Sequence, residues 1–111
     1  MARHLLTDFE LMILLAVLRT GDEAYGVRIA REIEAITGRR VMLGAAYAAL
    51  ERLENNGLAS SSTGTATPER GGRAKRFFRT TKAGTAAVKA SLDTVSAMTE
   101  GVELKSVVKI R

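Results

Sequence analysis

Apolar residues run without interruption from Leu11 to Leu18, directly after the tetrapeptide Thr7-Asp8-Phe9-Glu10. A threonine followed three residues later by glutamate is typical of a capping box at the start of a helix. We therefore expect a helix that begins near Thr7 and ends near Gly21, where glycine can adopt the left-handed conformation. Because this helix is apolar on every side, one core face cannot cover it, and a second subunit is expected to bury Leu11 and Leu15.

Two further helical patterns follow, joined by a short turn. The first is predicted over about residues 23–37, with Asp22 as its N-cap and a stripe of isoleucines at helical spacing, Ile29, Ile33 and Ile36. The second is predicted over about residues 43–56, where the sequence Asn-Asn-Gly closes it. Three short helices joined by tight turns favour a helix-turn-helix.

The helix over residues 43–56 has two different faces. Four apolar positions fall on one side and are expected in the core: Leu43, Ala46, Leu50 and Leu53. The opposite stripe consists of small residues and one cation: Ala45, Ala48, Ala49 and Arg52. Such a face can enter a DNA major groove, where alanine methyl groups contact thymine methyl groups and the arginine bonds guanine or a phosphate. High helix propensity alone explains an alanine-rich helix equally well.

The composition changes after Gly57, where the only proline of the chain and several glycines occur. Two short strands are expected around a long connection, over about residues 58–64 and 75–80. We expect Phe77 and Phe78 to anchor the second strand to the core, and the pattern leaves open which of the two points inward.

A fourth helix is predicted to begin near Thr81. Apolar residues recur along this segment at heptad spacing, interrupted by Thr99, and we assign them to a dimerisation face: Val88, Leu92, Val95 and Val102. The residues after Gly101 are compatible with a continued helix or with a strand.

Composition narrows the function classes. The 111-residue chain carries 17 Lys and Arg against 12 Asp and Glu, a net charge of +5, which favours an acidic partner such as nucleic acid. Its length suits one domain. The absence of cysteine excludes disulfides and suits the cytoplasm. Because His4 is the only histidine, we expect no enzyme activity, no metal and no cofactor. The apolar run at 11–18 is shorter than the ~20 residues that span a bilayer, so no membrane partner is expected.

The positive charge is concentrated in the predicted hairpin. Between Gly64 and Arg79 the only carboxylate is Glu69, against five basic residues, Arg70, Arg73, Lys75, Arg76 and Arg79. The pair Gly71 and Gly72 lacks the spacing of nucleotide-binding loops, G-x-x-x-x-G-K-[ST] or G-x-G-x-x-G before a helix. We therefore expect a hairpin tip that approaches a DNA backbone, with its arginines on phosphates or in the minor groove. A solvated loop with incidental charge is the alternative.

Three segments of the chain, in this order and at these separations, resemble the PadR-like transcriptional regulators. They are EAYG at 23–26, YAALERLENNGL at 47–58 and GGRAKRFFRTTKAG at 71–84. The resemblance implies a mostly α fold with a small β-hairpin. It divides into a winged helix-turn-helix over residues 1–80 and a C-terminal dimerisation helix and tail of the same domain over residues 81–111.

The resemblance also implies the roles of particular residues. The helix over 43–56 becomes the recognition helix and the 58–80 hairpin becomes the wing, with DNA contacts expected from Tyr25, Gly44, Ala45, Tyr47, Ala48, Arg52, Arg70, Gly71, Gly72, Arg73 and Lys75. The two tyrosines match family aromatics, and core packing explains each of them equally well. Many members carry Thr before and Pro after the tyrosine of the recognition helix, where this chain has alanines, so specificity is expected to lean on Arg52, the wing arginines and DNA shape.

These observations together predict a cytoplasmic, homodimeric repressor that binds a pseudo-palindromic operator in double-stranded DNA. The resemblance further implies release by a small aromatic or hydrophobic effector, with Phe9, Met12 and Met98 as lining residues. A winged-helix module that docks on a protein is the alternative from another class. RNA binding stays open, although the aromatic residues that stack on single-stranded bases are few.

Overall fold

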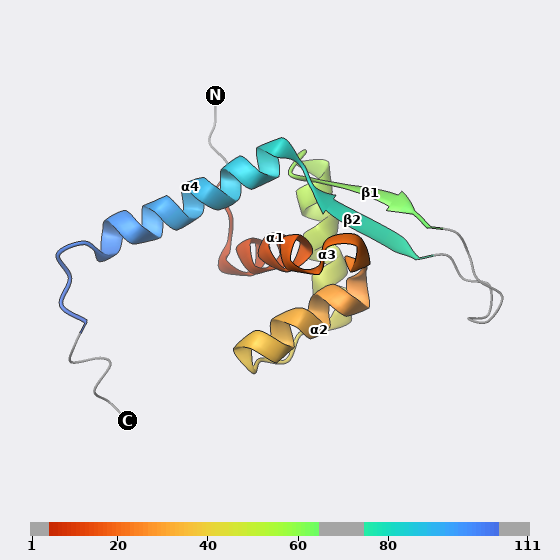
Figure 1. Cartoon of the computed structure of the whole chain (residues 1–111), viewed down its shortest axis with the longest axis horizontal. Coiled ribbons are helices and arrows are strands. Elements are labelled where there is room, and N and C mark those ends of the chain that lie inside the picture. The colour runs from red at the N-terminus through yellow and green to blue at the C-terminus, as the bar shows by residue number, and fades with distance from the viewer. Residues whose placement is uncertain (1–4, 65–74, 105–111) are drawn as a thin grey trace.

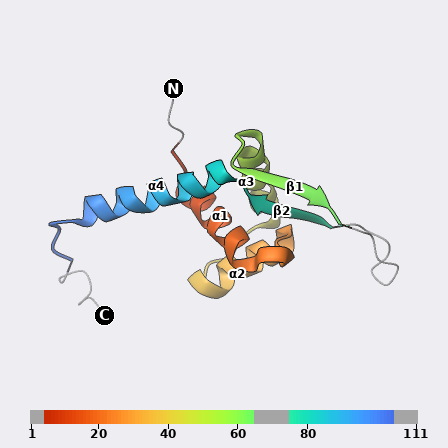
Figure 2. The same ribbon diagram turned by 45° about the horizontal axis from the view of Figure 1, so that its top comes forward.

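A computed structural model of the chain describes residues 5–64 and 75–104. In chain order its elements are α1 (Asp8–Thr20), a 3₁₀ turn η1 (Gly21–Glu23), α2 (Gly26–Thr37), α3 (Leu43–Asn55), β1 (Ala59–Thr63), β2 (Arg76–Thr80) and α4 (Lys82–Thr99) (Figure 1). The first three helices form a body from which the hairpin and α4 extend in opposite directions (Figures 1 and 2). This arrangement confirms the predicted winged helix-turn-helix, mostly helical with a small hairpin.

Helix α1 begins with the predicted reciprocal capping box. The Thr7 hydroxyl accepts from the Glu10 amide at 3.1 Å, and the Glu10 carboxylate accepts from the Thr7 amide at 3.0 Å. One face of the helix is buried in the core, while Leu11 and Leu15 are half-buried and Leu18 is exposed. The helix therefore keeps uncovered apolar surface, as its all-round apolar pattern predicts.

Helix α2 begins three residues later than predicted, and Asp22 is not its N-cap. Asp22 lies in η1, and the N-cap is Tyr25, whose backbone is extended with φ −116° and ψ 164°. The cause is a tertiary contact, because the Phe78 amide donates to the Ala24 carbonyl at 2.8 Å and Tyr25 forms an antiparallel bridge with Phe77. The segment before α2 thus pairs with β2 instead of joining the helix.

Three apolar positions depart from the predicted core pattern. Ile36 is 56% and Leu43 is 41% exposed, whereas Ala49 is fully buried. Ile36 lies in the last turn of α2 and Leu43 is the first residue of α3, so both lie at helix ends. The exposed stripe of small residues on α3 is therefore narrower than predicted, because Ala49 belongs to the core.

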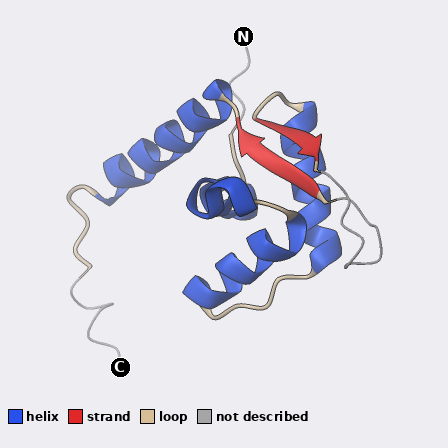
Figure 3. Ribbon diagram, turned by 45° about the vertical axis from the view of Figure 1, so that its right-hand side comes forward, coloured by secondary structure: helices blue, strands red, loops and turns tan. Residues whose placement is uncertain are grey.

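The hairpin has one face on the core. Its two strands are antiparallel (Figure 3). Ala59 lies opposite Thr80, and Thr63 lies opposite Arg76. Phe78 is the aromatic that points inward, with 4% of its surface exposed, whereas Phe77 is half-buried.

The Thr-x-x-Gly sequence joins the hairpin to α4. The Thr81 hydroxyl accepts from the Gly84 amide at 3.0 Å, which caps the helix, and it donates to the Gly57 carbonyl at 2.7 Å. A side chain at Gly84 would collide with the Leu58 carbonyl, so only glycine permits this close approach.

The first half of α4 packs on the body, and the second half extends past it (Figures 1 and 3). Val88 is buried in the chain's own core, which removes it from the predicted dimerisation face. Leu92, Val95 and Met98 are exposed, as is Val102 after the helix ends. Within the described residues, no helix is both long enough and apolar enough to cross a lipid bilayer.

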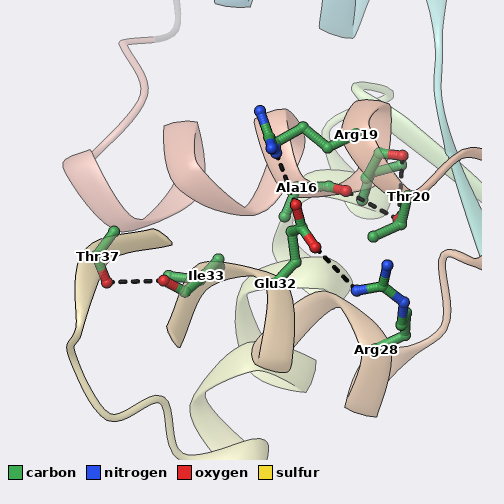
Figure 4. A network of polar contacts seen from close by, with 8 residues as sticks. Ala16, Arg19, Thr20, Arg28, Glu32, Ile33 and Thr37 are labelled. Atoms are coloured by element: carbon green, nitrogen blue, oxygen red, sulfur yellow. Dashed lines mark hydrogen bonds and ion pairs between the residues drawn. The ribbon is translucent and has the colours of Figure 1, made fainter. Parts of the chain in front are cut away.

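A carboxylate on α2 ties that helix to α1 (Figure 4). Glu32 accepts from Arg19 of α1 at 2.7 Å and from Arg28, one turn earlier on α2, at 2.9 Å. These two hydrogen bonds hold the pKa of Glu32 below its ordinary value, and the one from Arg19 has the larger effect.

At the C-terminal ends of the two helices, the hydroxyls of Thr20 and Thr37 donate to carbonyls of their own helices (Figure 4).

Candidate nucleic-acid interface

The N-terminal part of α3 presents an apolar surface to solvent. Met42 is 65% and Leu43 is 41% exposed, and Gly44, Ala45 and Ala48 are exposed beside them. We call these five residues the apolar start of α3. A side chain at Gly44 would meet open space, so the helix backbone there is accessible from outside. The exposure of Gly44, Ala45 and Ala48 agrees with the prediction, whereas Met42 and Leu43 were not expected here.

Tyr47 fixes α3 against the beginning of α2. Its ring and hydroxyl lie so close to the Gly26 backbone that any side chain at Gly26 would collide with them. Tyr47 is still 41% exposed, so it both packs and borders the open surface. No side chain caps the first turn of α2, and the free amides at this positive helix end therefore lie next to the tyrosine. Such an arrangement suits a phosphate group.

A stack of side chains places a cation near the same helix end. The Lys75 ammonium lies 4.2 Å from the centre of the Tyr25 ring. That ring meets Phe77 edge-on, with the ring centres 5.6 Å apart and the planes at 75°. Because Tyr25 is the last residue before α2, the stack places the positive charge on the ring of the residue that precedes this helix. The Tyr25 ring is therefore packed on the wing, and Lys75 is the group that adds charge.

Arg52 is engaged inside the fold. Its Nε donates to the Glu10 carboxylate at 3.0 Å, and the Glu10 side chain is only 6% exposed. A buried carboxylate without a cation costs free energy, so Arg52 has a structural task in neutralising Glu10. Half of the Arg52 side chain is exposed, but its guanidinium is held toward the start of α1. This differs from the expected free cation at the end of the alanine stripe.

The base of the wing is tied to α3 by a three-residue network. The Glu54 carboxylate accepts from Arg76 at 2.6 Å and from the Ser61 hydroxyl at 2.8 Å. Arg76 also donates to the Ser61 hydroxyl at 3.0 Å. Arg76 is thus partly neutralised, although its side chain is 43% exposed, and Arg79 is also exposed on the same strand. The predicted contacts at the tip, Arg70, Gly71, Gly72 and Arg73, lie outside the described residues.

Two further cations were missed from the sequence. Arg39 and Arg40 are exposed in the turn between α2 and α3, immediately before the apolar start of α3. The turn is held by the Glu34 carboxylate, which accepts from the Val41 amide at 2.8 Å. The sequence contains this signal, since two consecutive arginines lie two residues before the predicted recognition helix.

The predicted dimerisation and effector residues lie in different environments. Met12 and Leu15 line an apolar groove between α1 and α2, together with Ile36, and its volume is about 270 Å³. Phe9 packs against the core from its edge. Met98 is 73% exposed in the last turn of α4, which extends past α1, so the three proposed effector residues do not form one pocket in a single chain (Figures 1 and 2).

The described residues contain no group of three or more His, Cys, Asp and Glu side chains arranged to hold a metal ion. The groups that this surface offers are apolar side chains, free amides and cations. They can bind a polyanion that also has apolar features.

Comparisons with known proteins agree with this geometry. The sequence model of the transcriptional regulator PadR-like family matches residues 14–90. The structure of a transcriptional regulator from Clostridium thermocellum, Cth-833, is similar at 25% sequence identity and a TM-score of 0.67, covering 85% of this chain and 89% of that one. The complex structure of hsRosR-S4 is similar at 26% identity and a TM-score of 0.65, covering 93% and 86%.

The fold also recurs at lower sequence identity. A PadR-like transcriptional regulator from Bacillus cereus strain ATCC 14579 is 16% identical, with a TM-score of 0.69 over 93% of each chain. Among curated protein sequences no match was found.

Proposed function

The chain belongs to the PadR-like family of transcriptional regulators, which are not enzymes, and from this premise we propose that it is a cytoplasmic repressor that binds an operator in double-stranded DNA. The observation that carries the proposal is the set of cations around the apolar start of α3. Arg39 and Arg40 precede it in the chain. Lys75 lies over the ring of Tyr25, the residue before the beginning of α2, where Tyr47 packs. Apolar side chains face base edges in this arrangement, while cations face phosphates.

The N-terminus of α2 supplies a second kind of contact in the proposed complex. Its first amides have no side-chain cap, Tyr47 packs against Gly26 in the same turn, and Lys75 lies over the ring of Tyr25, the residue before the helix. A backbone phosphate bound there would fix the register of α3 in the major groove. We propose the wing residues Arg70, Gly71, Gly72 and Arg73 as further contacts to the DNA backbone or minor groove.

The apolar surface that the chain leaves open supports the proposal of a homodimer. Leu92, Val95 and Val102 are exposed at or beyond the far half of α4, and Leu11 and Leu15 are only half-covered on α1. We propose that these residues pair two copies about a two-fold axis. The two α3 helices would then reach half-sites about one helical turn apart, ~34 Å, in a pseudo-palindrome.

An effector site is proposed at the groove that contains Met12. The groove is lined mainly by apolar side chains, and it lies beside the surface of α1 that we assign to the dimer. Phe9 and Met98 would complete the site only if the partner copy brings them close. A small hydrophobic molecule bound there would change the spacing of the two α3 helices and release the DNA.

The proposal is tested by the salt dependence of DNA affinity. Fluorescence anisotropy with the chain's own promoter duplex should give a dissociation constant that rises steeply with salt. In the double variant Arg40→Ala with Lys75→Ala, the slope of log Kd against log salt should fall by about 0.9 for each phosphate that the variant no longer neutralises. Lys89→Ala removes an exposed cation of α4 and serves as the matched control, with an unchanged slope. An unaltered slope in the double variant, or no binding at low salt, contradicts the proposal.

A further inference from the structure

We infer that the chain selects its operator by contacts to the 5-methyl groups of thymine, made by the apolar start of α3. The inference rests on the proposed function, because it concerns which base-pair feature α3 reads once the chain is on DNA. It extends the sequence-based expectation that alanine methyl groups of this helix contact thymine, by adding Met42 and Leu43. It departs from the expectation that Arg52, the wing arginines and DNA shape provide the specificity.

The first step is the chemistry that α3 exposes. Its first two turns, residues 43–50, contain no polar side chain except that of Tyr47. The Tyr47 ring and hydroxyl lie against the Gly26 backbone, so this group is directed to the start of α2. What remains for base edges is the thioether of Met42, the isobutyl group of Leu43 and the methyl groups of Ala45 and Ala48.

The second step is the position of the charged residues of α3. Arg52 donates to the buried Glu10 carboxylate at 3.0 Å and is held toward α1. Glu51 is exposed, but it follows Ala48 by three residues, so it lies about 4.5 Å farther along the helix axis. Neither side chain lies within the apolar start of α3, which therefore has no hydrogen-bonding side chain of its own.

The third step is the feature of DNA that fits such a surface. In the major groove the distinctive apolar group is the 5-methyl of thymine, whereas the other base edges present hydrogen-bond donors and acceptors. A polar edge placed against Met42 or Leu43 would lose its water without gaining a partner. The accessible backbone at Gly44 allows close approach, and the thioether side chain of Met42 adapts to a methyl group in more than one position. Thymine is thus favoured and cytosine disfavoured at the contacted pyrimidines.

The experiment replaces thymine by deoxyuridine, which lacks the 5-methyl group and keeps every hydrogen-bonding group. An operator duplex is first selected from a random pool by the purified full chain, and affinity is measured by fluorescence anisotropy at fixed salt. Each contacted thymine changed to deoxyuridine should weaken binding about fourfold, the effect of one buried methylene-sized group. Symmetric replacement in both half-sites should weaken binding about fifteenfold if the two effects are independent.

Protein variants assign the effect to α3. In Met42→Ala and Ala48→Gly, deoxyuridine at the thymine that each residue contacts should no longer weaken binding, so the ratio of the two dissociation constants should approach one. Leu18→Ala removes an exposed apolar side chain from α1 and should leave the deoxyuridine effect unchanged. Because the readout is the ratio between two DNA duplexes, a change in protein stability alone does not alter it.

The possible results separate this inference from the proposed function. Tight binding of the thymine operator with a deoxyuridine effect that depends on Met42 or Ala48 supports the inference. Tight binding with no deoxyuridine effect at any thymine, or an operator without thymine in its half-sites, overturns the inference and leaves the proposed function standing. Failure to bind any duplex overturns both.

Discussion

The contact between Gly26 and Tyr47 sets how α3 lies on α2. A β-carbon at position 26 would overlap the tyrosine ring, so Gly26→Ala must displace the ring or the helix that carries it. We expect the free energy of unfolding to fall by about 1–3 kcal/mol, as for other overpacked sites. DNA affinity should fall as well, because α3 and the start of α2 can no longer contact the duplex together. Urea unfolding and anisotropy measure the two effects.

Gly44 provides the matched control for that substitution. It lies in the first turn of α3, where an added methyl group meets open space. Gly44→Ala should therefore raise the free energy of unfolding by up to about 1 kcal/mol through helix propensity. If both alanine variants changed stability by the same amount and in the same direction, the proposed role of Gly26 would be wrong.

At the scale of elements, the wing is positioned by Glu54. Its carboxylate joins α3 to both hairpin strands through Ser61 and Arg76. Glu54→Gln removes the ion pair and makes the chain more positive, which by charge alone should strengthen DNA binding. We expect about fivefold weaker binding instead, since a partly exposed pair contributes at most about 1 kcal/mol and the wing loses its fixed orientation.

Asp93→Asn is the control for charge. Asp93 is exposed on α4, and the substitution makes the same change in net charge away from the hairpin. It should leave affinity unchanged or raise it slightly in the same anisotropy titration. Equal or tighter binding by Glu54→Gln would show that the network does not position the wing.

The link between α1 and α2 should respond to acid. The pKa of Glu32 is lowered from its ordinary 4.5 by hydrogen bonds from Arg19 and Arg28. Its contribution to stability is therefore complete above pH 4.5 and is lost as the pH falls through the lower, folded-state pKa. The difference in free energy of unfolding between wild type and Glu32→Gln should be constant near neutral pH and shrink in acid. Denaturant titrations at several pH values check this, and a difference that stays constant into acid would contradict it.

The sequence predicts those elements whose signals are local. The capping box at Thr7 and Glu10 lies within four residues, and the Thr-x-x-Gly at Thr81 likewise marks the beginning of α4. The beginning of α2 could not be found in this way, because it is set by a hydrogen bond from Phe78 to a carbonyl far away in the chain. Helical periodicity cannot reveal such a partner.

The candidate site likewise contains some features that follow from the local sequence and others that depend on tertiary contacts. Exposure of Gly44, Ala45 and Ala48 follows from the helical pattern of α3, and the sequence predicts it. Arg52 pairs with Glu10, which is 42 positions away in the chain, so the sequence pattern could not predict that the arginine has a carboxylate partner. Exposure of Met42 and Leu43 depends on where the neighbouring helices end, and that is a property of the tertiary structure.

At the scale of the whole molecule, the exposed half of α4 should determine the oligomeric state. Val95 is 55% exposed, and Val95→Glu would place two carboxylates near each other across the proposed two-fold axis. Like charges that face each other across an interface cost several kcal/mol, so the dissociation constant of the dimer should rise more than about a hundredfold. Sedimentation should show a folded monomer for this variant and a dimer for Lys89→Glu, a charge reversal at a residue already exposed and polar. A monomeric wild type would contradict the dimer.

The most direct test of the central claim is selection of bound duplexes from a random DNA pool by the purified chain, followed by sequencing. Two copies of α3 related by two-fold symmetry predict an enriched pseudo-palindrome whose half-sites lie about 10 base pairs apart. Enrichment of a single unrepeated half-site would contradict the symmetric dimer, and a pool that shows no enriched sequence would contradict sequence-specific DNA binding itself.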